Sequence, residues 1–135
     1  MKKIAAVILC IMMMGAMSGC GGSPSSDVDL TKMSATMVYS EVYNMVYTPE
    51  DYVGKTIKMR GLFTAMYDEA QEKIIHTCII EDATQCCAQG IQFDLTEIPD
   101  VYPEGGTEVT VEGVFDTYEI NGETGCYLKD SVFVE

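Results

Sequence analysis

The chain has 135 residues, 47% of them hydrophobic, and its 21 acidic residues outnumber eight basic ones, giving a formal charge of −13 at pH 7. This length is enough for one folded domain with one core and too short for two. The acidic excess repels phosphate backbones and anionic lipid headgroups, so nucleic acid is excluded as an expected ligand, as is direct adhesion to a membrane surface.

The first 20 residues combine a basic start, an apolar stretch and a cysteine. Two lysines precede the apolar residues 4–16, a run too short to span a bilayer but typical of a signal-peptide core. The following run MSGC, residues 17–20, resembles the lipobox of bacterial lipoproteins, in which the bond before the cysteine is cut and its thiol is joined to diacylglycerol. We therefore expect residues 1–19 to be a lipoprotein signal peptide and Cys20 to be the lipidation site. The protein would then be anchored by lipid to the extracytoplasmic face of the cell membrane.

A short polar segment follows the predicted anchor. Residues 20–30 are rich in glycine and serine and are expected to form a flexible tether. The two lysines leave with the signal peptide while all 21 acidic residues remain, so residues 20–135 carry a formal charge of −15. The folded domain is expected to comprise residues 31–135.

The first element expected in this domain is an amphipathic helix at residues 34–47. Its apolar positions recur at spacings near 3.6 and are Val38, Val42, Met45 and Val46. Three tyrosines along the helix form a stripe, which fits either core packing or a partner surface. Pro49 favours a second, short helical turn that ends before Gly54.

Beyond Gly54 the apolar periodicity changes to two, which predicts strands. The five expected strands are residues 57–65, 73–80, 90–95, 108–118 and 126–134. Asn121-Gly122 is a strong signal for a two-residue hairpin between the last two. Gly61 and Gly113 lie in mid-strand positions, where glycine indicates a bulge or sharp coiling.

Five strands with this spacing and coiling predict a mainly β protein that resembles an OB-fold, a small five-stranded barrel. That fold usually carries a helix between its third and fourth strands. Residues 96–106 contain two prolines and two glycines and cannot form much of one. We expect the helix at 34–47 to cover an open end of the barrel instead.

Four cysteines remain for the folded domain: Cys78, Cys86, Cys87 and Cys126. Outside the cytoplasm an even number of thiols favours disulfides. The third and fifth strands of an OB-like barrel are parallel neighbours, so Cys86 or Cys87 should approach Cys126. Adjacent residues of a strand point to opposite faces, so only one of the pair can form the bridge, and the sequence leaves open which. The bridge would close a loop of about 40 residues and stabilise the fold by roughly 3 to 4 kcal/mol.

Two alternatives involve the same thiols. A zinc or copper site could use Cys86, Cys87 and Cys126, or the set His76, Cys78, Cys87 and Cys126, because residues 76 and 78 share one face of a strand. An exposed vicinal pair could also exchange disulfides, although no nearby cation is evident to lower a thiol pKa. No motif of a hydrolase rises above chance, and the chain has a single histidine for acid-base chemistry.

The segment DATQCCAQGIQFDL, residues 82–95, is the most distinctive part of the mature chain. With TPEDYVGKTIKMRG (48–61), YPEGGTEVTVEG (102–113) and GCYLKD (125–130), it resembles a family of small OB-fold-like lipoproteins of Gram-positive bacteria that shares the motif DATxCCAxG. The resemblance covers nearly the whole mature chain and implies no particular activity. We therefore expect a non-catalytic binding or accessory module of the cell envelope, without a cofactor, whose partner is an envelope protein or a small ligand.

Overall fold

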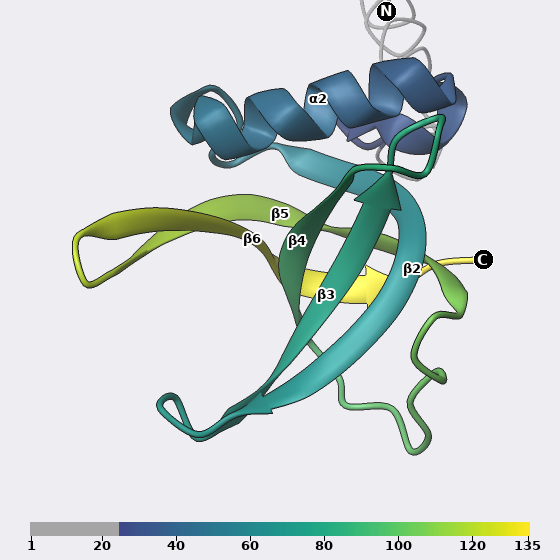
Figure 1. The fold of residues 1–135 in the computed structure, drawn as a ribbon. Coiled ribbons are helices and arrows are strands. Elements are labelled where there is room, and N and C mark those ends of the chain that lie inside the picture. Colours follow the sequence, from purple (N-terminus) through teal and green to yellow (C-terminus); the bar gives the residue numbers. More distant parts are fainter. Residues whose placement is uncertain (1–24) are drawn as a thin grey trace, which may run out of the picture.

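The computed structural model describes residues 25–135 and is mainly β (Figure 1). The predicted signal peptide and Cys20 lie outside the described residues. In chain order the elements are β1 Val28–Asp29, η2 Leu30–Lys32, α2 Ala35–Tyr47, η3 Pro49–Asp51, β2 Thr56–Asp68, β3 Lys73–Glu81, β4 Ala88–Leu95, β5 Glu108–Ile120 and β6 Glu123–Phe133.

Five strands close into a barrel with an OB-fold-like order. The sheet runs β1-β2-β3-β4-β6-β5, and an additional pairing of β2 with β5 closes the ring. All ring pairings are antiparallel except that of β4 with β6. The five predicted strands are therefore present, and the expected parallel contact between the third and fifth of them is confirmed.

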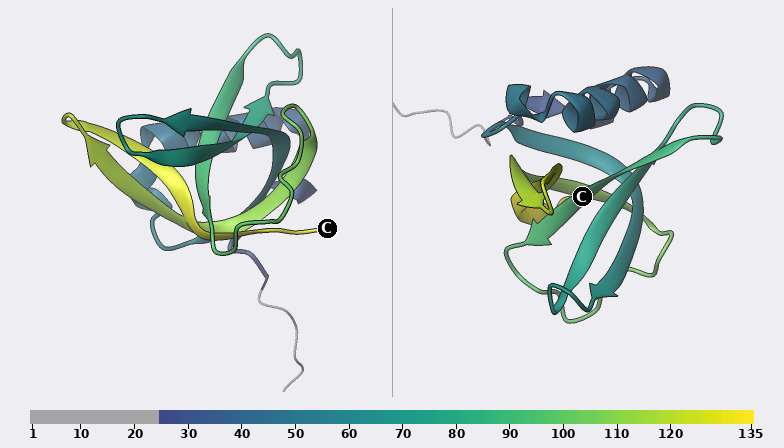
Figure 2. Two further views of the ribbon diagram at one scale, coloured as in Figure 1. Left: turned by 90° about the horizontal axis from the view of Figure 1, so that it is seen from below. Right: turned by 60° about the vertical axis from the view of Figure 1, so that its left-hand side comes forward.

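The alternating apolar residues of the strands fill the inside of the barrel. Seen from below, the strands form a ring, and α2 lies behind it (Figure 2). The fully buried strand residues are mostly large and apolar: Phe63, Phe93, Phe115, Ile57, Met59, Ile91, Val111 and Leu128. Burial of such side chains contributes about 1.5 to 3 kcal/mol each and is the main force that closes the sheet.

Helix α2 lies across one end of the barrel, as Figure 1 shows. Val42 and Met45 are fully buried in the core, and Val38 packs against it. Val46 was expected on the same face but is 36% exposed, because the barrel end contacts a narrower stripe than the sequence pattern predicted. Residues 96–106 contain no helix, as their prolines and glycines predicted.

The predicted tether extends too far along the chain. Val28 and Asp29 pair in parallel with β2, and Leu30 is only 2% exposed. Ser26 donates a hydrogen bond from its hydroxyl to the Glu112 carboxylate at 2.8 Å. The flexible segment expected at residues 20–30 was therefore wrong at its C-terminal end, since the apolar residues after Asp27 find partners on the barrel.

The two mid-strand glycines have different roles. Gly113 lies where the β5–β6 register shifts, so the predicted bulge is confirmed there. Gly61 lies where β2 leaves β5 and begins to pair with β3, since Leu62 pairs with Glu108 on one side and Ile79 on the other. A Cβ atom at Gly61 would overlap the Ile79 carbonyl oxygen, so glycine is required by close approach of two backbones.

Within the described part of the chain, no helix has both the length and the apolar character needed to cross a bilayer.

Candidate functional site

His76 and Cys78 point into the barrel from β3, as their shared strand face predicted. His76 is 7% exposed and its ring stacks on Tyr102 and Phe93 at centroid distances of 5.2 and 5.5 Å. Neither ring nitrogen has a hydrogen-bond partner among the described residues, and burial lowers the pKa of His76. Cys78 is fully buried, and burial raises its pKa to about 12. Both side chains act as core residues at neutral pH.

The predicted disulfide between Cys126 and the vicinal pair is wrong. All four cysteines of the described chain are free. The β4–β6 register pairs Gln92 with Tyr127, which puts Cys126 beside Ile91. Cys87 lies four residues earlier on an extended chain, about 13 Å away, whereas a bridge requires Cα atoms within about 7 Å. The prediction that β4 and β6 are neighbours was right, but the register of their pairing keeps Cys87 and Cys126 apart.

The vicinal cysteines lie on the loop between β3 and β4, at the α2 end of the barrel (Figure 1). Both are exposed, and their Sγ atoms are 3.6 Å apart. The loop, residues 82–87, continues the strand ladder, because the Asp82 N–H donates to the Cys87 carbonyl at 2.9 Å. Gln85 turns the chain with a positive φ of 57°.

The Asp82 side chain organises this loop. Its Oδ1 accepts hydrogen bonds from the backbone N–H groups of Cys86 and Cys87 at 3.0 and 3.4 Å. Its Oδ2 lies 3.4 Å from the Cys86 Sγ and accepts from the Thr84 hydroxyl at 2.9 Å. One carboxylate and two thiols therefore lie close together on this loop. We call residues 82–87 the thiol loop.

The metal sets expected from the sequence do not assemble. In the described residues the one group of three potential metal-ligating atoms within 4.8 Å of one another consists of Asp82, Cys86 and Cys87. Cys126 is half-buried against the core on β6, where burial raises its pKa. His76 and Cys78 are enclosed in the barrel and do not reach the thiol loop. The sequence thus identified two of the three clustered residues and missed Asp82.

A second feature is a groove between the two long hairpins. In Figure 1 the β2–β3 hairpin projects at the bottom and the β5–β6 hairpin at the left. Between them lies a cleft of about 270 Å³, which we call the hairpin groove. Its lining residues come from the two hairpins and from β4: Gln71, Lys73, Gln92, Asp94, Tyr118, Glu119, Ile120 and Tyr127.

Two tyrosines form the aromatic wall of the hairpin groove. The rings of Tyr118 and Tyr127 meet edge to face with centroids 5.9 Å apart. Tyr118 lies against Gly125 of the opposite strand, where a Cβ atom would overlap its ring. Across the groove Lys73 and Asp94 form an exposed ion pair at 3.8 Å. The groove therefore combines fixed aromatic surface with amide, carboxylate and ammonium groups.

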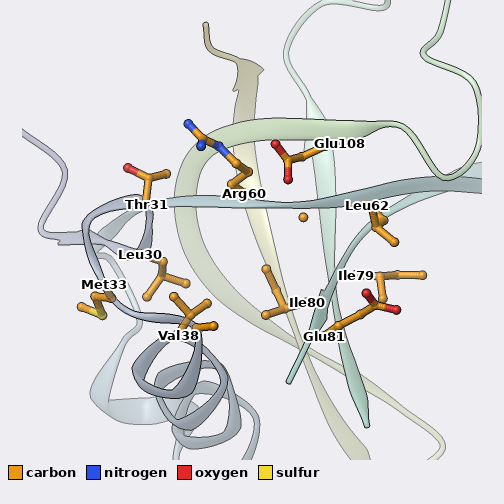
Figure 3. Close-up of a pocket in the computed structure, with 12 residues that line it drawn as sticks. Leu30, Thr31, Met33, Val38, Arg60, Leu62, Ile79, Ile80, Glu81 and Glu108 are labelled. Atoms are coloured by element: carbon orange, nitrogen blue, oxygen red, sulfur yellow. The ribbon is translucent and has the colours of Figure 1, made fainter. Parts of the chain in front are cut away.

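A second cleft, of about 310 Å³, separates the helical segment from the barrel wall. Figure 3 shows Leu30, Met33 and Val38 on one side of it and Ile80 of β3 facing them. Its rim carries charged side chains, including Arg60, whose Nε donates to the Thr110 hydroxyl at 3.2 Å. Apolar side chains therefore form the two walls of this cleft, and charged side chains lie at its rim.

The hairpin groove was missed at the level of sequence because its residues come from segments about 50 residues apart. Comparisons of the chain with protein-family models, with curated proteins and with solved structures found no match.

Proposed function

We propose that this protein is a lipid-anchored, non-catalytic module of the cell envelope that binds a short glycan segment in the hairpin groove. The observation that carries the proposal is the position of the groove, between two hairpins and over the outer face of β4. Anchoring rests on the sequence signal at Cys20.

The hairpin groove lies where OB-fold proteins commonly bind their ligands. OB-fold proteins bind oligonucleotides and oligosaccharides on the face of their second and third strands, between the loops that join strands 1–2 and 4–5. Here those strands are β3 and β4, and the two loops are the tips of the hairpins that flank the groove. Because one fold can carry many functions, the ligand is identified by the chemistry of the groove.

The groove's chemistry favours a neutral, hydroxyl-rich ligand. Tyr118 and Tyr127 offer aromatic surface and phenol groups, and Gln71 and Gln92 offer amides that donate and accept. A formal charge of −15 on the mature chain opposes a polyanion such as nucleic acid. The chain's single histidine is buried in the core, so it is not placed to act as an acid or base in the groove.

A Tyr127→Ala substitution should weaken glycan binding roughly five- to tenfold. It removes one ring of the aromatic wall and, with it, the edge-to-face contact that holds the Tyr118 ring in place. The measurement is an NMR titration of the full-length protein in detergent with a linear tetramer of N-acetylglucosamine. Tyr47→Ala is the matched control, since Tyr47 is 63% exposed on α2 and away from the groove. The proposal fails if shift changes centre on the cleft beside α2, or if Tyr127→Ala binds as tightly as the unmodified protein.

A Cys20→Ser substitution should release the protein from the membrane, because an acyl chain contributes about 0.8 kcal/mol per buried methylene and the hydroxyl of serine cannot form the thioether. We expect the unmodified protein in the membrane fraction and the variant outside it, as measured by fractionation and incorporation of a labelled fatty acid. Cys126→Ser should remain lipidated and membrane-bound. Equal membrane retention of the Cys20 variant would contradict the proposed anchor.

A further inference from the structure

We propose that the thiol loop is a zinc site in which Cys86, Cys87 and Asp82 supply three ligands and the fourth position is open to solvent or to a second molecule. The site is separate from the hairpin groove, because it lies at the opposite, α2 end of the barrel (Figure 1). The proposal does not depend on glycan binding.

The sulfur atoms already have the separation that tetrahedral zinc requires. Zinc–sulfur bonds of about 2.3 Å at a tetrahedral angle place two sulfurs about 3.8 Å apart. The Cys86 and Cys87 Sγ atoms are 3.6 Å apart. Adjacent strand residues would point in opposite directions, and the loop instead turns both side chains to the same side.

The carboxylate has a matching position. A zinc–oxygen bond of about 2.0 Å beside a zinc–sulfur bond places oxygen and sulfur about 3.5 Å apart in tetrahedral geometry. The Asp82 Oδ2 lies 3.4 Å from the Cys86 Sγ. Because Oδ1 is held by the backbone N–H groups of Cys86 and Cys87, the orientation of Oδ2 is fixed by the residues that carry the sulfurs.

The Thr84 hydroxyl is placed to orient two of the proposed ligands. The Thr84 hydroxyl lies 2.9 Å from the Asp82 Oδ2 and 3.0 Å from the Cys86 Sγ. Hydrogen bonds from such outer-shell groups hold metal ligands in position, and their loss typically weakens metal binding about 10- to 100-fold. Exposure of both cysteines leaves a path by which the ion can enter.

The charge balance is simple. One Zn²⁺ replaces the protons of two thiols and binds one carboxylate, giving a site of net charge −1 and two released protons. The neighbouring Cys86 raises the pKa of the Cys87 thiol. Because both thiols must lose their protons to bind the ion, zinc affinity should rise with pH.

The test uses full-length protein in detergent with the thiols reduced, titrated with zinc chloride against a chromophoric chelator. We expect one zinc per chain, with affinity reduced about 100-fold or more in Cys86→Ser and in Cys87→Ser. Asp82→Asn keeps an oxygen that can accept from the backbone but removes the anionic ligand, and should cost about tenfold or more. Cobalt in place of zinc should show the visible bands of a tetrahedral thiolate complex.

Cys126→Ser is the matched control, because it removes one thiol outside the thiol loop and leaves residues 82–87 unchanged. Its zinc affinity should equal that of the unmodified protein. Absence of zinc binding with reduced thiols, an unchanged affinity in the Cys86→Ser/Cys87→Ser double variant, or an equal loss in Cys126→Ser would each overturn the proposal. So would an affinity independent of pH, since two protons must leave.

Discussion

Replacing Phe93 with alanine is expected to lower the free energy of unfolding by about 3 to 5 kcal/mol. The Phe93 side chain is fully buried, and its ring is in contact range of Phe63, His76 and Phe133 at centroid distances of 6.3, 5.5 and 5.9 Å. The substitution leaves a cavity in the middle of an aromatic cluster and removes several ring pairs at once. Urea denaturation of the full-length protein, followed by circular dichroism, measures the change.

Ile98→Ala is the control for this prediction, because Ile98 is an equally apolar residue that is 78% exposed in the loop between β4 and β5. Its effect should stay within about 0.5 kcal/mol. Since a domain of this size has a total stability of about 5 to 15 kcal/mol, Phe93→Ala should move the unfolding midpoint visibly. A loss below about 1 kcal/mol would mean that the aromatic cluster is not the centre of the core.

The strands could be predicted from the sequence because each carries a local signal. Alternation of apolar residues identifies β4 by Ile91 and Phe93, and Asn121-Gly122 marks the β5–β6 turn. The structure places Asn121 at a φ of 56° and Gly122 at 84°, as such a hairpin turn requires. The strand ends were less well predicted, because pairing continues into residues whose side chains have left the core.

The positions of the cysteines could be predicted only in part from the sequence. The order of the strands predicted that β4 and β6 are parallel neighbours, but the pairing of Gln92 with Tyr127 follows from how the barrel packs, and no local signal determines it. A register different by four residues would have brought Cys87 beside Cys126. The role of Asp82 had a usable signal, since an aspartate at the start of a loop often accepts hydrogen bonds from the backbone that follows.

Replacing Gly61 with alanine is expected to cost about 3 kcal/mol or more, at or above the usual range for an overpacked core. Alanine is the smallest possible change, yet its Cβ would overlap the carbonyl oxygen of Ile79 and lie 2.8 Å from the Cys78 Sγ. At this point β2 passes from its pairing with β5 to its pairing with β3, so strand separation would disturb both seams of the barrel. Urea denaturation again provides the measurement.

Gly105→Ala is the matched control, since a Cβ atom there meets nothing within 4 Å, and its effect should be near zero. A second comparison separates backbone from side-chain obstruction. If Cys78 were the main obstacle, combining Gly61→Ala with Cys78→Ala would recover stability relative to the sum of the single changes. Because the obstacle is the Ile79 carbonyl, which no side-chain change removes, we expect little recovery. Full rescue in the double variant would show that the two strands can separate at Gly61 and that the barrel tolerates a wider seam.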